Sequence, residues 1–237
     1  MAARRPVDTP PEAHAATRQT LLSAAADVFA ECGFRSATIR DICRRAGANV
    51  AAINYHFGDK AALYSEVLSD QSRVVRERFP ARPADVESLS AEQQLAAFIR
   101  TFLQRVLSPD VHARHGRIMT REMVDPTDAL DRLVKEAIRP DAERLMAIMR
   151  AMLGPDLPAS TIRLCGMSVV GQILFYCHCQ PVIRRLFPDL PADASRLDEL
   201  AEHITRFSLA ALKHFPAAPA GSRSARLGRK GSSPAPA

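Results

Sequence analysis

The sequence predicts an all-α protein with about nine helices. Between the two ends of the chain, apolar side chains recur at steps of three and four residues, which is the period of an amphipathic helix. No stretch shows the sustained alternation of apolar and polar residues that is typical of a half-buried strand. Residues that favour helix starts and stops, such as Thr38, Gly47 and Ser90, stand where the periodic segments begin and end.

The composition is that of an ordinary globular chain. Of 237 residues, 47% are hydrophobic and 24% are charged, so most of the chain should fold. We find no apolar run near the roughly 18 residues that a membrane span needs, and residues 1–14 lack the apolar core of a secretory signal. We therefore expect a cytoplasmic protein with no membrane partner. Its five cysteines are an odd number without paired spacing, which does not indicate a disulfide framework.

The net charge of +6 does not by itself indicate a nucleic-acid partner. The segment 216–237 holds four of the 32 basic residues and no acidic one. This leaves 28 basic side chains against 26 acidic ones in residues 1–215, which is nearly balanced. Because residues 1–14 are polar with three prolines and residues 216–237 are rich in Gly, Ser, Pro and Ala, we expect both ends to be disordered.

The first helices are short and have clear boundaries. One runs from about Ala16 to Glu31 and is stopped by Gly33. The second begins at Thr38, with Asp41 as a capping-box partner, and ends at Gly47. Asn49 is a good N-cap for a short third helix, and a fourth runs from Asp59 or Lys60 to about Phe79.

The later helices are longer. We expect them over residues 90–106, 109–124, 126–153, 160–180 and 194–215. Pro140 lies inside the third of these, where its ring should kink the helix.

Residues 38–60 form the most informative segment, because two short helices flank a tight turn at Gly47, as in a helix-turn-helix. On a wheel of the second of these helices, Val50, Ile53 and Phe57 would pack inward. The other side chains would point outward or flank that face: Ala51, Ala52, Asn54, Tyr55 and His56. A short helix that presents an aromatic ring, an amide and an imidazole is well explained as a helix offered to a groove.

The segment from Ile53 to Lys60 (INYHFGDK), followed by Leu63-Tyr64, resembles the N-terminal domain of TetR-family regulators, and the resemblance extends back to Arg18. It implies a DNA-binding domain over residues 15–62 and a ligand-sensing and dimerisation domain over 63–215. It further implies a homodimer that binds a palindromic operator and is released, as a repressor, by a small-molecule effector.

By this resemblance the DNA-contacting residues would be Thr38, Arg40, Asn49, Val50, Ala51, Ala52, Asn54, Tyr55, His56 and Lys60. Lys60, Thr38 and Arg40 would hold phosphate, while the helix of residues 50–57 would meet the bases. Two points stay open. The helical wheel places Val50 toward the core, whereas the resemblance includes it among the DNA contacts. For Arg44 and Arg45, a DNA-contacting role and a place on the solvated face of their helix are equally supported.

Residues 119–188 are similar to a TetR subgroup with a CecR-like (CerR-like) C-terminal domain. Met and Phe side chains of the middle helices are either core or the lining of an adaptable ligand cavity. The cavity residues we expect are Phe98, Phe102, Met119, Glu122, Met123, Met149 and Phe175. For the dimer interface, with packing inside one subunit as the alternative, we expect Gly166, Val170, Leu174, Ile204, Phe207 and Ala211.

Other classes of function have less support. The sequence contains no phosphate loop, nucleophile elbow or metal-spaced His/Glu set, so we expect neither an enzyme nor a cofactor. Consecutive helical positions point about 100° apart, so Cys177-His178-Cys179 should not converge on a metal. An architectural DNA-binding protein without ligand sensing, and an activator instead of a repressor, remain alternatives.

Overall fold

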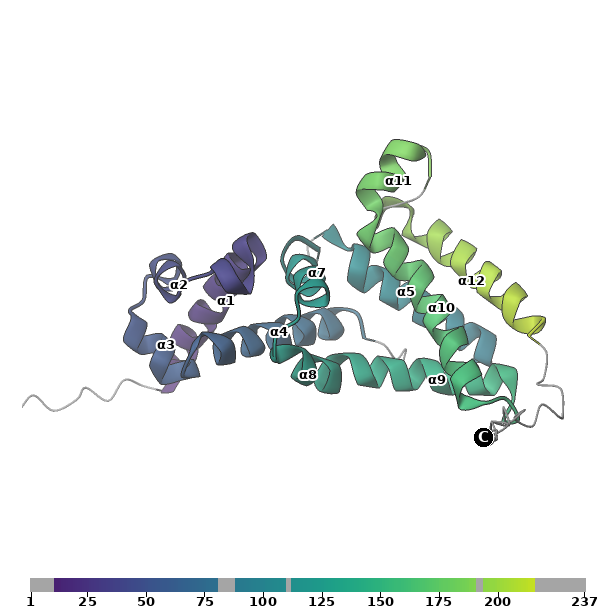
Figure 1. Cartoon of the computed structure of the whole chain (residues 1–237), viewed down its shortest axis with the longest axis horizontal. Helices are drawn as coiled ribbons and strands as arrows, with labels where there is room; N and C mark the ends of the chain where they lie inside the picture. Colours follow the sequence, from purple (N-terminus) through teal and green to yellow (C-terminus); the bar gives the residue numbers. More distant parts are fainter. Residues whose placement is uncertain (1–10, 81–87, 110–111, 191–193, 216–237) are drawn as a thin grey trace, which may run out of the picture.

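The computed structural model describes residues 11–80, 88–109, 112–190 and 194–215, and every regular element in these ranges is a helix (Figure 1). This confirms the predicted all-α class. Residues 1–10 and 216–237, where we predicted disorder, lie outside the described residues. Helix α1 begins at Pro11, so residues 11–14 of the expected disordered arm are helical.

The N-terminal unit is formed by α1 (Pro11–Ser36), α2 (Ile39–Ala46) and α3 (Val50–Phe57), which lie together at one end of the molecule (Figure 1). Helix α4 (Lys60–Arg78) runs from this unit into the body. Gly33 interrupts α1 with φ 78° and ψ 171°, as expected of a helix stop. This region of the backbone map is open essentially to glycine alone.

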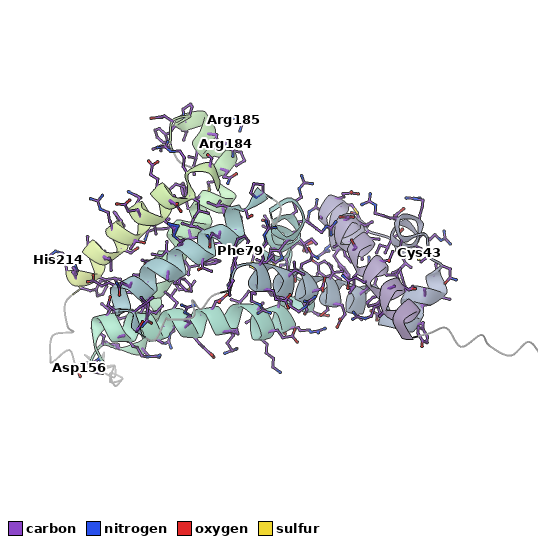
Figure 2. The ribbon with its side chains drawn as sticks, turned by 180° about the vertical axis from the view of Figure 1, so that it is seen from behind. Cys43, Phe79, Asp156, Arg184, Arg185 and His214 are labelled. Atoms are coloured by element: carbon purple, nitrogen blue, oxygen red, sulfur yellow. The ribbon has the colours of Figure 1, made fainter. Side chains whose placement is uncertain are left out.

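The body is built from α-helices of 5 to 20 residues, and α11 projects from it (Figure 1). Its α-helices are α5 (Ala91–Leu107), α7 (Arg117–Val124), α8 (Ala129–Leu133), α9 (Arg139–Leu153), α10 (Ala159–His178), α11 (Gln180–Leu186) and α12 (Leu197–Lys213). Figure 2 shows Cys43 of α2 and Arg184 of α11 far apart along the molecule. Sequence analysis missed α11 as a separate helix, although Pro181 in its first turn is a normal starting residue.

Where a kink was expected around Pro140, the chain forms a π-helical turn, η3 (Val134–Ile138), between α8 and α9. Proline has no N–H, so it cannot donate to the carbonyl four residues earlier, that of Glu136. The guanidinium of Arg76 on α4 donates to this carbonyl instead, at 2.5 Å. A second π-helical turn, η2 (His112–Gly116), leads directly into α7.

Buried side chains form two cores. The first joins α1–α4 to α7 and α8, with Phe29, Ile53 and Leu63 packed together with Ile118 and Leu133. The second lies among α5, α9, α10 and α12. The N-terminal unit therefore shares its core with helices far beyond residue 62, and the expected domain boundary falls inside the continuous helix α4.

Helix α10 is long and apolar enough to cross a membrane by length and composition alone, which sequence analysis did not foresee. Helices of soluble proteins that pack against other helices pass the same test. Only a third of the apolar window is buried within the chain.

Candidate nucleic-acid interface

The turn between α2 and α3 is built by local chemistry. Gly47 adopts the left-handed conformation, φ 63° and ψ 30°, that a residue with a side chain rarely occupies. Thr38 caps α2 by accepting from the Asp41 amide at 3.1 Å, and Asn49 caps α3 by accepting from the Ala52 amide at 2.9 Å. The two predicted caps are therefore present, and each side chain satisfies a backbone amide in the first turn of its helix.

Helix α3 has an inner face and an outer face. Ile53 and Phe57 are buried in the first core, as the helical wheel predicted. Tyr55 is 74% exposed, and Ala51 and Asn54 are exposed as well. His56 is half-buried, with its ring 5.0 Å from that of Tyr55. The aromatic ring and the amide thus stand on the outer face of a rigidly seated helix.

Two positions of α3, Val50 and Ala52, differ from the helical-wheel prediction. Val50 is 44% exposed, so its inward placement was wrong. Its neighbours Asn49 and Ala51 are exposed too, which places the first turn of α3 beyond the edge of the core. Ala52, expected to point outward, is half-buried and packs against the core.

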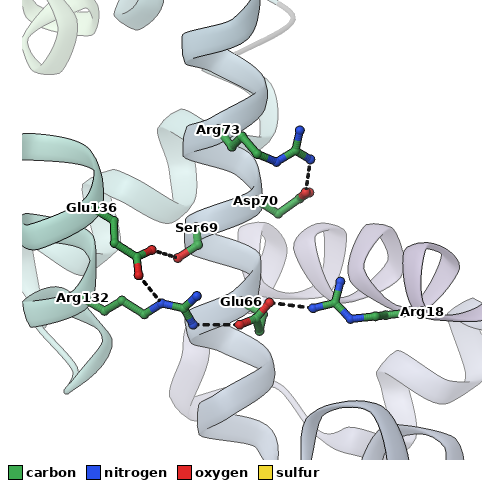
Figure 3. A network of polar contacts seen from close by, with 7 residues as sticks. All are labelled: Arg18, Glu66, Ser69, Asp70, Arg73, Arg132 and Glu136. Atoms are coloured by element: carbon green, nitrogen blue, oxygen red, sulfur yellow. Dashed lines mark hydrogen bonds and ion pairs between the residues drawn. The ribbon is translucent and has the colours of Figure 1, made fainter. Parts of the chain in front are cut away.

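A chain of polar contacts connects α1, through α4, to α8 (Figure 3), and its arginine on α1 also lies against α3. The guanidinium of Arg18 lies over the Phe57 ring, 5.1 Å from its centroid, and pairs with Glu66 of α4 at 2.6 Å. Glu66 also accepts from Arg132 of α8 at 2.8 Å, and Arg132 in turn pairs with Glu136. The pKa of Glu66 is lowered, chiefly by its hydrogen bond from Arg132.

Lys60 was predicted to hold phosphate, but its side chain contacts the backbone of its own chain. It is half-buried, and its ammonium donates to the carbonyls of Phe34 at 3.0 Å and Ala37 at 3.1 Å, with a longer contact to Arg35 at 3.4 Å. Its Nζ also lies 4.6 Å from the centroid of the Phe34 ring. In this geometry Lys60 supports the loop between α1 and α2, and its contact with phosphate remains a prediction only.

Of the three arginines of α2, Arg44 and Arg45 form ion pairs, and Arg40 lies exposed at the start of the helix. Arg45 makes a two-point contact with Glu31 of α1, at 2.7 and 2.9 Å, and the hydrogen bond from Arg45 lowers the pKa of Glu31. Arg44 pairs with Asp41 within α2 at 2.5 Å. Arg40 is exposed at the start of the helix, where a phosphate contact was predicted.

Helix α7 connects the N-terminal unit to the body, a role that sequence analysis missed. Arg121 donates to the Glu31 carbonyl of α1 at 2.9 Å. Just beyond α7, Asp125 accepts two hydrogen bonds from Arg35, both at 2.8 Å. The sequence signal was the charged pair Arg121-Glu122 among methionines, but spacing alone cannot show that its partners lie some 60 to 90 residues away.

The predicted ligand cavity does not form as one site. Glu122 is 0% exposed and accepts from the Tyr64 hydroxyl at 2.8 Å and from Thr127, so it belongs to a buried network between α4 and α7. Met119 packs against the first core, whereas Met123 and Phe175 are exposed.

The other three predicted cavity residues belong to the second core. Phe98 and Met149 are buried there, and Phe102 packs against it. Phe98 and Phe102 line only a small cavity, which has room for about one water molecule. The set fails as a cavity because a shared helical face does not decide which neighbouring helix covers each residue.

Two predicted dimer residues are also corrected. Gly166 is buried against α9 of its own subunit, since an added Cβ would lie 2.2 Å from the Met146 methyl. Ile204 is fully buried in the second core. Val170 and Leu174 are half-buried, while Phe207 and Ala211 are exposed on α12.

Within the described ranges, no group of three His, Cys, Asp or Glu side chains is placed to hold a metal ion. In the Cys177-His178-Cys179 segment, the Cys177 thiol points toward the Val106 carbonyl, with its sulfur 3.7 Å from that oxygen. Burial raises the pKa of this thiol.

A helix-turn-helix with an exposed recognition face, joined through one long helix to a larger helical body, defines a DNA-binding regulator. Residues 21–67 match the family model of bacterial regulatory proteins of the tetR family, and residues 91–212 match that of the C-terminal domain of the HTH-type transcriptional dual regulator CecR. The chain belongs to the TetR family, in the subgroup with a CecR-type C-terminal domain.

Individual relatives agree with this assignment. CecR of Shigella flexneri is 29% identical over 167 residues, which cover 67% of this chain and 74% of that protein. BetI of Cronobacter sakazakii is 32% identical over 82 residues, or 35% of this chain and 41% of that protein.

Solved structures show the same fold. A TetR-like regulator from Rhodococcus sp. RHA1 aligns with a TM-score of 0.58 at 18% identity, covering 89% of this chain and all of that one. A regulator from Pseudomonas aeruginosa PAO1 aligns with a TM-score of 0.61 at 20% identity, covering 88% and 97%.

Proposed function

We propose that the chain is a cytoplasmic repressor that binds a palindromic operator as a homodimer and is released by a small molecule. The observation that carries the DNA-binding part is the outer face of α3. Tyr55, Asn54 and Ala51 are exposed there, while Ile53 and Phe57 seat the helix in the core. A short helix of this kind, presented at one end of the molecule, fits the major groove.

The homodimer is supported by a stripe of exposed apolar residues on α10. Leu164, Met167, Gly171 and Phe175 follow one another at steps of three and four residues, so they share one helical face. On the neighbouring helix α12, Phe207 is 60% exposed. Two helices per chain with such faces suit a four-helix interface between two copies.

Release by a ligand is supported by the contacts between the N-terminal unit and the body. The unit is held at α7 by Arg121 and Arg35, and at α4 and α8 by Arg18 and Arg132. A change in the body therefore has direct mechanical routes to α1 and α3. Ligand and operator would weaken each other's binding by the same factor.

The test of DNA binding begins with selection of an operator from random DNA. Replacing Tyr55→Ala should weaken operator binding by about 1–3 kcal/mol with little effect on random DNA. Val74→Ala, which truncates a half-exposed apolar side chain on α4, serves as the control and should bind normally. If folded Tyr55→Ala protein binds the operator as tightly as the parent, α3 does not read the sequence.

The same selected site tests the dimer. The operator should contain two half-sites related by two-fold symmetry and should bind two chains. Phe207→Asp should convert the free protein to monomers in sedimentation, whereas Val182→Asp, on exposed α11, should not. A Phe207→Asp protein that remains dimeric would contradict the proposed interface.

A further inference from the structure

We propose that a cleft between α1, α7 and the corner of α10 and α11 binds a small anionic molecule, one that carries a carboxylate or phosphate group. Binding there would loosen the contact between α7 and the helix-turn-helix. This inference rests on the proposed function, because it names the site and the chemical class of the releasing ligand. It replaces the apolar cavity that the sequence predicted and the structure does not form.

The cleft has the size and the walls of a ligand site. Its volume is about 450 Å³, within the range of small-molecule sites. One wall carries Arg117, Thr120 and Arg121 of α7, and the opposite wall carries His178 and Gln180. Most of these groups are polar, and none of the lining side chains is large and aliphatic or carries a benzene-type ring. The cleft therefore favours a ligand with a polar or charged group over a purely apolar one.

Helix α7 presents its cations to the cleft together. Arg117, Thr120 and Arg121 are separated by three and four positions, so they lie on one face of the helix. Gly116, which also lines the cleft, closes the π-helical turn η2 immediately before α7. Single π-helical turns occur frequently at functional sites.

The charge of the cleft favours an anion. Its lining has two arginines and one carboxylate, that of Glu31, which is already engaged by both guanidinium nitrogens of Arg45. Arg117 is exposed and makes no hydrogen bond or ion pair within the described ranges, although its charge helps to lower the pKa of Glu31. A planar guanidinium binds carboxylate and phosphate oxygens through two parallel hydrogen bonds, so Arg117 and Arg121 form a suitable pair of donors.

The same arginine links the cleft to the DNA-binding unit. Arg121 donates through Nη2 to the Glu31 carbonyl, near the break of α1 at Gly33. Gly33 allows this close approach, because an added Cβ would lie 2.5 Å from Nη1 of Arg121. A bound anion would compete with the Glu31 carbonyl for the guanidinium and so weaken the hold of α7 on α1.

The binding experiment uses the full chain without DNA and titrates three probes calorimetrically: benzoate, phenyl phosphate and neutral benzamide. We expect benzoate or phenyl phosphate to bind at one site per chain and at least tenfold more tightly than benzamide. The tighter of the two anions identifies carboxylate or phosphate as the preferred group. Equal binding of benzamide, or no binding of either anion, overturns the proposal.

Variants locate the site. Arg117→Gln should weaken the bound anion by about tenfold or more, as expected for loss of a charge-assisted pair of hydrogen bonds. Arg150→Gln on α9 removes the same charge from an exposed position outside the cleft and should leave the affinity unchanged. If Arg117→Gln lacks a normal helical circular dichroism spectrum, Arg117→Lys provides the test, because it keeps the charge and loses the paired geometry. Parent-like affinity in the folded variant overturns the site.

A second readout separates this inference from the proposed function. The bound anion should lower operator affinity, and operator should lower anion affinity by the same factor. An anion that binds through Arg117 without changing operator affinity would overturn the link through Arg121. Failure to bind an operator at all, measured without any probe, would instead overturn the proposed function.

Discussion

The hydrogen bond between Tyr64 and Glu122 offers a sharp test of how the N-terminal unit is joined to the body. Tyr64 on α4 is 3% exposed and Glu122 on α7 is fully buried, with 2.8 Å between the hydroxyl and the carboxylate. Burial and this hydrogen bond raise the pKa of Tyr64, so the phenol stays protonated and donates. Tyr64→Phe removes the donor and leaves the ring contacts with Phe29 and Phe34, each at 4.9 Å between centroids.

The expected loss follows from the chemistry of the pair. A hydrogen bond to a charged group contributes roughly 1.5–3 kcal/mol. Glu122 keeps its two contacts from Thr127, at 2.8 and 3.0 Å, so it is not left without partners. We therefore expect Tyr64→Phe to lower the free energy of unfolding by about 2 kcal/mol, near the middle of that range.

Urea unfolding followed by circular dichroism measures this loss. Tyr55→Phe provides a matched control, because the Tyr55 ring is largely exposed and its change should fall within about 0.5 kcal/mol of zero. In a Glu122→Gln background, Tyr64→Phe should cost less than in the parent, since the charged acceptor is already absent. A change smaller than about 0.5 kcal/mol for Tyr64→Phe in the parent would refute the reasoning.

Two further predictions concern pH and backbone conformation. Burial lowers the pKa of His115 to about 4, from about 6.5 in an unfolded chain, so the unfolded state takes up the proton first as pH falls. The stability that the neutral imidazole contributes is complete above pH ~6.5 and is lost as the pH falls toward ~4. Between pH ~7.5 and ~4.5 this loss amounts to about 2–3 kcal/mol of the free energy of unfolding. In urea unfolding, His115→Gln should remove this part of the pH dependence. Equal pH dependence in parent and variant would contradict the burial of this ring. Gly33→Ala should cost about 1–3 kcal/mol, because its backbone conformation is open essentially to glycine. The contrasting change Ser36→Ala, at the exposed last residue of α1, should fall within about 0.5 kcal/mol of zero.

The helix-turn-helix was predictable from the sequence because its determinants are local. Thr38 and Asn49 cap helices through amides three residues ahead, and Gly47 supplies the left-handed turn without help from distant residues. The spacing of Ile53 and Phe57 placed the buried face of α3 and left Tyr55 outside. Sequence periodicity carries this information because each of these relations spans a few residues.

The partners of the remaining residues were decided by tertiary structure. Lys60 reaches the carbonyl of Phe34, and Glu122 meets Tyr64, across 26 and 58 positions. Gly166 and Ile204 lie on apolar faces, as expected, yet those faces are covered by their own subunit. The sequence by itself determined which residues share a helical face. Only packing decided what covers that face, because a helical period contains no information about the neighbouring helix.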